Sequence, residues 1–289
     1  MDDFRTILRR TRSKLSVVQP MDSFPFISGD AYRLRCDVDL SNSPERVGKL
    51  LNTLDPFKEL SIFVGGENEG YKLLQYLTGK NLRTSWNLFF HNRDVAPSNH
   101  HLCKLVKRVN KVFSQGWIGR HESICAIPSG LENYSKLRNG VPGDYLREIK
   151  KNVESERAIS VFISFKVSNN LPERNHLRKL FSKIEGSYAP KEPINPKRYR
   201  KALLNSKYVI SPPGNGPDCH RTWESIYLGA TPVVLRKFWP FAQDNLPVLV
   251  VDEWSDAIDV IELESKFEKA SFNNWNSYKL WDKYVAQYL

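Results

Sequence analysis

The stretch from Tyr208 to Leu235 constrains the fold more than any other part of the chain, because an apolar run, a glycine- and proline-rich turn, a polar segment and a second apolar run follow one another in it. Residues 208–210 favour an extended strand, and Pro212-Pro213 end it because proline supplies no N–H group to a strand ladder. Apolar residues then recur at helical spacing from Asp218 to Leu228, before residues 231–235 return as a buried strand. This order predicts a parallel βαβ unit.

The turn before this helix has the composition of an anion-binding loop. Gly214 and Gly216 let a ligand approach the main chain closely, while Asn215 is expected to cap the helix and Pro217 to occupy its first position. The start of a helix offers unpaired N–H donors and the positive end of the helix dipole. The loop therefore predicts a site for an anion such as a diphosphate, and a tight structural turn is the alternative.

Three polar residues of the predicted helix lie at offsets of three and four and share one side. His220 and Arg221 would add positive charge beside the anion, and Glu224, one turn further on, would accept hydrogen bonds from a ribose. The alternative for all three is a solvated helix face.

The residues SPPGNGPDCHRTWESIYLGATPVV, from Ser211 to Val234, resemble the donor-binding signature of exostosin-like glycosyltransferases, especially the short members encoded by bacteria and large DNA viruses. The resemblance implies an α/β fold of the GT-B type. In that architecture two Rossmann-like domains face a cleft, the C-terminal one holds the nucleotide sugar, and a C-terminal helix crosses back. The donor-binding residues that the resemblance implies are Ser164, Phe165, Arg174, Ser211, Pro213, Gly214, Asn215, Gly216, His220, Arg221, Thr222 and Glu224.

The segment SFKVSNNLPER, from Ser164 to Arg174, resembles the family segment in which a strand end and a downstream arginine meet the diphosphate. Lys166 and Arg174 are thus further cation candidates. A surface role is the alternative for Lys166, whereas Arg174 stands at an expected helix start, where an arginine is unfavourable to the helix dipole and indicates a nearby anion.

Sugar transfer also needs a base for the acceptor hydroxyl, expected across the cleft on a loop that follows a strand. The HNRD segment that begins at His91 resembles the family's His-Asn-x-Asp segment, so Asp94 is the first candidate for the base. Asp30, in a predicted Gly-Asp turn, and Glu67 follow it, and each carboxylate has a turn or cap role as its alternative. His91 and Asn92 are the candidates for contacting the acceptor, and orienting the base is the other role open to His91.

Alternating strands and helices predict parallel α/β units on both sides of a polar stretch, Val141 to Glu156, which is expected to be a linker. The predicted domains are an acceptor-binding domain at 1–150, a nucleotide-sugar-binding domain at 151–265, and a helix at 266–289 that packs back on the first. The first domain is expected to contain a loop feeding a strand at Phe24–Leu40, strands at Leu60–Val64 and Asn87–Phe90, and a helix at His101–Phe113.

The net charge of +11, from 43 Lys and Arg against 32 Asp and Glu, indicates an anionic partner, for which nucleic acid is a rival to a sugar nucleotide. The densest basic cluster lies in residues 5–14 and has no recognisable zinc finger, basic zipper or RNP sequence beside it. We therefore expect no nucleic-acid partner, and a basic nucleic-acid-binding protein remains the alternative from another class.

A metal-dependent GT-A enzyme is the enzymatic alternative, because Asp37-Val-Asp39 has the DxD spacing that holds a divalent ion on a diphosphate. In a strand, two aspartates at this spacing also form an ordinary solvated edge. The four cysteines are scattered without a CxxC pair, which argues against a zinc site. We expect no metal and no cofactor other than the nucleotide sugar.

The resemblance to xylosyltransferase-type members from viruses of algae implies an inverting, metal-independent transfer of xylose from UDP-xylose to a glycan, such as a glycan of the viral coat. No run approaches the ~18 apolar residues that span a bilayer, and the start of the chain lacks the apolar core of a signal peptide. We expect no membrane span and a cytoplasmic location.

Overall fold

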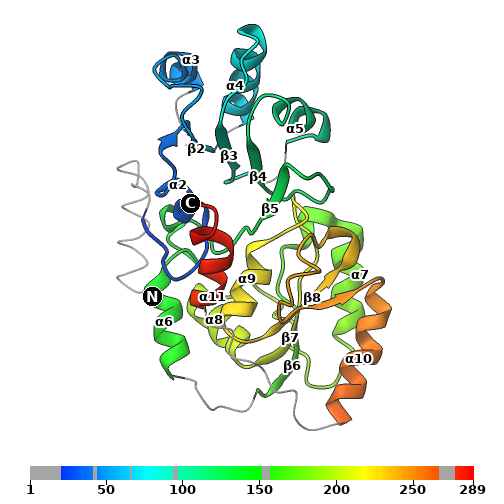
Figure 1. Cartoon of the computed structure of the whole chain (residues 1–289). Coiled ribbons are helices and arrows are strands. Elements are labelled where there is room, and N and C mark those ends of the chain that lie inside the picture. The colour runs from blue at the N-terminus through cyan, green and yellow to red at the C-terminus, as the bar shows by residue number, and fades with distance from the viewer. Residues whose placement is uncertain (1–20, 42–43, 66, 94–96, 152–156, 267–276) are drawn as a thin grey trace.

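The computed structural model describes residues 21–41, 44–65, 67–93, 97–151, 157–266 and 277–289. Its two parallel sheets confirm the predicted α/β class with two Rossmann-like units, one in each half of the chain. The first sheet has the strand order β1-β2-β3-β4-β5 and the second the order β6-β7-β8-β9. Figure 1 shows the first sheet with α3, α4 and α5 in its upper part and the second with α7 to α10 in its lower part.

The strands of the first sheet are β1 (Val38–Asp39), β2 (Leu60–Val64), β3 (Trp86–Phe90), β4 (Lys111–Gln115) and β5 (Ile124–Ile127). The strands of the second sheet are β6 (Ile159–Phe162), β7 (Ser206–Ile210), β8 (Thr231–Leu235) and β9 (Leu249–Val251). The helices are α2 (Gly29–Arg33), α3 (Val47–Leu51), α4 (Glu67–Gly79), α5 (Asn99–Leu105), α6 (Pro142–Lys151), α7 (Leu171–Phe181), α8 (Pro196–Leu204), α9 (His220–Tyr227), α10 (Trp254–Lys266) and α11 (Ser277–Trp281).

The strands of the first sheet follow one another in chain order, so right-handed crossovers place α3, α4 and α5 on one face. On that face, Ile62, Leu88 and Val112 pack with the apolar sides of these helices. The alternate residues Phe63 and Phe89 point to the opposite face, as the period of a strand requires, and belong to a core that the second sheet shares.

This shared core joins the two halves of the chain. It contains Tyr32 from α2, Trp223 from α9 and Leu280 from α11. The C-terminal segment contacts both halves of the chain. The ring centroids of Trp281 and Phe24 are 5.0 Å apart, and those of Tyr284 and Trp223 are 5.8 Å apart. Figure 1 shows this segment in red between α2 and α9. The predicted domain boundaries stay predictions.

Three sequence-based expectations about the elements are wrong. The expected helix at His101–Phe113 ends with α5, and the strand β4 begins at Lys111. The expected linker at Val141–Glu156 contains α6, which spans Pro142–Lys151. The predicted Gly29-Asp30 turn is the first turn of α2, because the side chain of Ser28 caps this helix by accepting from the N–H of Ala31.

Candidate functional site

The central motif forms the predicted βαβ unit of β7, α9 and β8, but α9 starts later than expected. Its N-cap is Cys219, whose side chain makes no capping hydrogen bond, so Asn215 is not the cap and Pro217 is not the first helical residue. No acidic residue occupies the first turn. The first turn of α9 therefore has neither a side-chain cap nor an acidic residue.

Arg174 supports the loop that precedes α9. Its Nη2 donates to the carbonyl of Pro213 at 2.8 Å, and its Nη1 donates to the carbonyl of Lys166 at 2.7 Å. A Cβ atom added to Gly214 would lie 3.3 Å from Nη2, so the loop and this guanidinium are in close contact. Burial lowers the pKa of Arg174, with the charge of Arg221 as a second cause. Arg174 thus holds the main chain of the loop, and its expected contact with a diphosphate stays a prediction.

Arg221 stands in the first turn of α9 and is half-buried. Its Nε donates to the carbonyl of Ser164 at 2.7 Å, at the carboxyl end of β6. The ring of Phe165 lies near both cations, with its centroid 5.5 Å from the Cζ atom of Arg221 and 5.4 Å from that of Arg174. Among the described residues, no salt bridge joins either arginine to a carboxylate. Of the two, Arg221 is half-buried whereas Arg174 is 2% exposed, so Arg221 is the better placed to meet an external anion.

Three other predicted donor residues are fixed by contacts inside the protein. The Oγ of Ser211 lies 2.8 Å from the Oγ1 of Thr222, which ties the end of β7 to α9. Glu224 is 3% exposed and accepts a hydrogen bond of 2.7 Å from the hydroxyl of Tyr199 on α8. Burial raises the pKa of Glu224. Glu224 therefore does not lie on a solvated helix face, which was the alternative to a role in donor binding.

The remaining predicted donor residues form the surface of the loop and its surroundings. Asn215 and Lys166 are exposed, while Pro213, Gly214 and Gly216 are half-buried. The N–H of Gly214 donates to the carbonyl of Gly216 at 2.9 Å, which closes the turn. These positions leave the outer side of the loop accessible.

A buried carboxylate that the sequence analysis missed joins α9 to the N-terminal half. The Oδ2 of Asp218 accepts from the N–H of Ser129 at 2.7 Å, and its carboxylate also accepts from the Nε1 of Trp223 at 2.9 Å. Next to it, the Nδ1 of His220 lies 2.8 Å from the carbonyl of Gly130. Asp218 directly precedes the N-cap, where an acidic residue usually has a local capping role. Its position in the sequence therefore does not indicate a hydrogen-bond partner far away in the chain.

Residues from three separate segments of the N-terminal half lie together beside this junction. The N–H of Asp30 donates to the Oδ1 of Asn133 at 3.0 Å, and the Nδ2 of Asn133 donates to the Oδ1 of Asn92 at 2.8 Å. A Cβ atom added to Gly29 would lie 1.7 Å from the Oδ1 of Asn92, so a larger residue there would require the side chain of Asn92 to move. Asn92 follows β3, Asn133 follows β5, and Asp30 lies at the start of α2. Carboxyl ends of parallel strands share one sheet edge, which explains the convergence.

Of the three candidate bases, the structure describes the carboxylate of Asp30 alone. Its Oδ2 accepts from the N–H of Tyr134 at 3.3 Å, and burial raises its pKa above the usual value of an aspartate. Asp94 lies outside the described residues. Glu67 begins α4, and its side chain also lies outside the described part of the chain.

His91 is a buried, neutral residue that follows β3. Its Nδ1 accepts from the N–H of Asn92 at 2.7 Å, which leaves the proton on Nε2, 2.9 Å from the carbonyl of Pro128. Burial lowers the pKa of His91 from 6.5 to about 4. This geometry fits a side chain that orients the loop after β5, and contact with an acceptor stays a prediction.

The depressed pKa of His91 predicts a pH dependence of stability. Between pH 6.5 and 4 the unfolded chain gains a proton at this residue that the folded chain does not, so stability falls as the pH is lowered through that window. We expect the free energy of unfolding to drop between pH 7 and 4 by about 3 kcal/mol more in the wild type than in His91→Gln. Urea unfolding at several pH values measures both curves. Parallel curves would contradict the buried neutral state.

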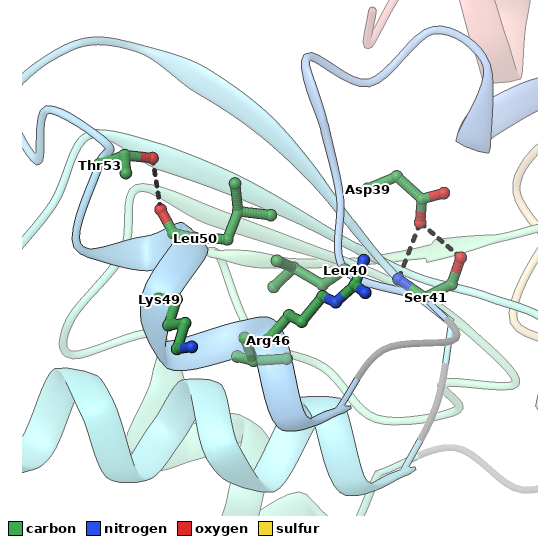
Figure 2. Close-up of a pocket in the computed structure, with 8 residues that line it drawn as sticks. Asp39, Leu40, Ser41, Arg46, Lys49, Leu50 and Thr53 are labelled. Atoms are coloured by element: carbon green, nitrogen blue, oxygen red, sulfur yellow. Dashed lines mark hydrogen bonds between the residues drawn. The ribbon is translucent and has the colours of Figure 1, made fainter.

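The two aspartates of the DxD alternative are held by separate partners. Asp37 accepts from the N–H and the hydroxyl of Ser61 at 2.8 and 2.7 Å, whereas Asp39 pairs with Arg33 at 2.6 Å and also accepts from Ser41. Asp39 and Ser41 line a groove of about 520 Å³ that extends over α3, shown in Figure 2. In the described part of the chain, no group of three or more His, Cys, Asp and Glu side chains is arranged to hold a metal ion.

Comparisons with known proteins give limited information. No protein-family model matches the chain, and no curated protein does so. Among solved structures, the chain is similar to an alpha-glucosyltransferase in complex with UDP-glucose and DNA containing an abasic site. The match has 13% sequence identity and a TM-score of 0.39, and it covers 86% of this chain and 80% of that one. This TM-score is too low to establish a common fold.

None of the helices in the described ranges has both the length and the apolar character that crossing a bilayer requires.

Proposed function

We propose that this protein is a glycosyltransferase that uses a nucleotide sugar and binds the donor diphosphate at the start of α9. The observation that carries the proposal is the pair of guanidinium groups near the ring of Phe165, beside a helix start without a side-chain cap and without a carboxylate partner among the described residues. A diphosphate supplies the negative charge that this arrangement lacks, and backbone N–H groups with Arg221 stabilise it as it leaves.

The proposed reaction is a direct displacement that inverts the anomeric carbon. Asp94 or Asp30 removes the proton of the acceptor hydroxyl, the hydroxyl oxygen bonds to the anomeric carbon, and the bond from that carbon to the diphosphate breaks. The electron pair of the broken bond leaves with the nucleotide diphosphate. The resemblance of the central motif supports inversion without a metal, with residues 1–150 binding the acceptor and residues 151–265 the donor.

For the donor we propose UDP-xylose and for the acceptor a glycan. Glu224 would accept hydrogen bonds from the ribose, since it follows Arg221 by three residues and therefore lies one turn further along the same side of α9. The sugar itself rests on the resemblance to xylosyltransferase-type members alone. A comparison of UDP-sugars therefore forms part of the test.

Calorimetric titration of the full-length protein with UDP, UDP-xylose and UDP-glucose, in EDTA and then in manganese, tests the proposal. We expect UDP to bind in EDTA, and at 100 times its Kd it should stabilise the fold by about 2.7 kcal/mol. Binding that requires manganese would contradict the metal-independent mechanism and direct attention to Asp37 and Asp39. Binding of duplex DNA that weakens steeply with salt, without any response to nucleotides, would favour the nucleic-acid alternative.

Slow hydrolysis of UDP-xylose in the absence of acceptor tests the stereochemistry. Because the donor carries its sugar in the α configuration, inversion by water should release β-xylose first. Proton NMR distinguishes the two anomers before they equilibrate. Initial release of α-xylose would contradict direct displacement.

A further inference from the structure

A buried hydrogen bond between a tyrosine and a carboxylate links α8 to α9 next to the proposed donor site. The hydroxyl of Tyr199 donates to the Oε2 of Glu224 at 2.7 Å. The ring of Tyr199 packs on Phe162 of β6, with centroids 5.8 Å apart, so the core fixes the position of the hydroxyl. The rotamer of Glu224 is in turn fixed by that hydroxyl.

This carboxylate has fewer partners than its burial demands. No salt bridge joins Glu224 to a cation among the described residues, and its Oε1 has no hydrogen-bond partner there. Oε1 is not among the fully buried side-chain atoms that lack a partner in the described part of the chain, so it reaches accessible space. An ionised carboxylate can accept several hydrogen bonds, and an accessible oxygen of an otherwise buried carboxylate next to a binding loop is placed to accept one from a ligand.

The geometry points to Tyr199 as a positioning residue that makes Glu224 selective for a ribonucleotide. This inference rests on the proposed function and goes beyond it, because Tyr199 acts through Glu224 and touches no substrate. With Oε2 occupied by Tyr199, Oε1 remains for a ribose hydroxyl. Glu224 follows Arg221 by three positions, a rise of about 4.5 Å along the helix, which suits the step from a diphosphate to the adjoining ribose.

The experiment compares UDP, 2′-deoxy-UDP and inorganic pyrophosphate as ligands of the full-length wild type and of Tyr199→Phe, by calorimetry in EDTA. We expect the wild type to prefer UDP over 2′-deoxy-UDP by about 10-fold, as one hydrogen bond to a charged group provides. In Tyr199→Phe this ratio should fall to about 2, while the Kd for pyrophosphate changes less than about 2-fold, because pyrophosphate does not reach Glu224. Glu224→Gln should lose the preference in the same way.

Tyr227→Phe is the matched control, since it removes a buried tyrosine hydroxyl from α9 itself. That hydroxyl accepts from the N–H of Ile27 at 2.9 Å and has no role at the ribose. The control should lower stability and keep the preference for UDP.

If Tyr199→Phe kept the wild-type preference for UDP over 2′-deoxy-UDP, the inference would be overturned. An equal loss of affinity for UDP and pyrophosphate would also overturn it, because it would indicate that the whole binding site is disturbed. If the wild type bound no UDP at all, the proposed function would fail and this inference with it.

Discussion

Replacing Arg221 with alanine is expected to weaken the binding of UDP by about 100-fold, or about 2.7 kcal/mol, because a charge-assisted hydrogen bond to a phosphate contributes about 1.5–3 kcal/mol. Arg221 anchors its Nε on the carbonyl of Ser164, which directs the rest of the guanidinium while leaving it without a carboxylate partner among the described residues. Arg174, by contrast, donates its hydrogen bonds to loop carbonyls. Arg221 is therefore the main cation for an incoming diphosphate.

Two variants serve as controls for Arg221→Ala. Arg221→Lys keeps the charge and loses the planar fork, so its affinity for UDP should be intermediate. Arg236→Ala removes an equal charge from an exposed arginine whose Nε is bonded to Asp252, and it should bind UDP as the wild type does. Calorimetry with UDP and with uridine completes the test. Because uridine has no phosphate groups, it cannot lose a contact with Arg221 when this residue is replaced. Unchanged UDP affinity in Arg221→Ala would contradict a diphosphate site at α9.

The central βαβ unit could be predicted from the sequence because its signals are local. Pro212-Pro213 must end a strand, and residues 232–235 of β8 are apolar and buried, as a parallel strand requires. The start of α9 was misplaced because the loop contains two residues, Asn215 and Pro217, that usually begin a helix. The fold uses neither in that way.

Partners far apart in the chain could not be predicted from such signals. Glu224 and Asp218 both have buried carboxylates whose hydrogen-bond donors, Tyr199 and Ser129, come from other elements. A polar residue in a sequence is expected to be exposed to solvent unless a buried hydrogen-bond partner is known. The convergence around Asp30 and Asn92 likewise depends on strand order, which places the ends of β3 and β5 at the same edge.

Helix α6 was mistaken for a linker because carboxylates occupy its buried side. Asp144 and Glu148 are both buried there with Tyr145, at positions where a helix normally presents apolar residues. The opposite error produced the helix expected at His101–Phe113. There, apolar residues of a short helix and of β4 happen to continue at helical spacing.

The buried pair that fastens α6 to α8 leads to the largest expected effect on stability. Asp144 and Arg200 are 6% and 5% exposed, and their closest oxygen and nitrogen atoms are 2.7 Å apart. Asp144→Ala would leave the guanidinium of Arg200 buried without its carboxylate, since its other acceptors are the carbonyl of Arg138 and the side chain of Asn139, both at 3.4 Å. We expect the free energy of unfolding to fall by about 3–5 kcal/mol.

Arg147→Ala is the matched control for Asp144→Ala, because Arg147 pairs with the same carboxylate at 3.1 Å but is 53% exposed. Its loss should cost less than about 1 kcal/mol. The double variant Asp144→Ala with Arg200→Met should recover most of the lost stability, because it removes the buried charge together with its partner. Urea unfolding at pH 7 measures all four proteins. If Asp144→Ala alone stayed within about 1 kcal/mol of the wild type, α6 would not depend on this pair, and the attachment of α6 to the second sheet would have to come from Tyr145 and its apolar neighbours.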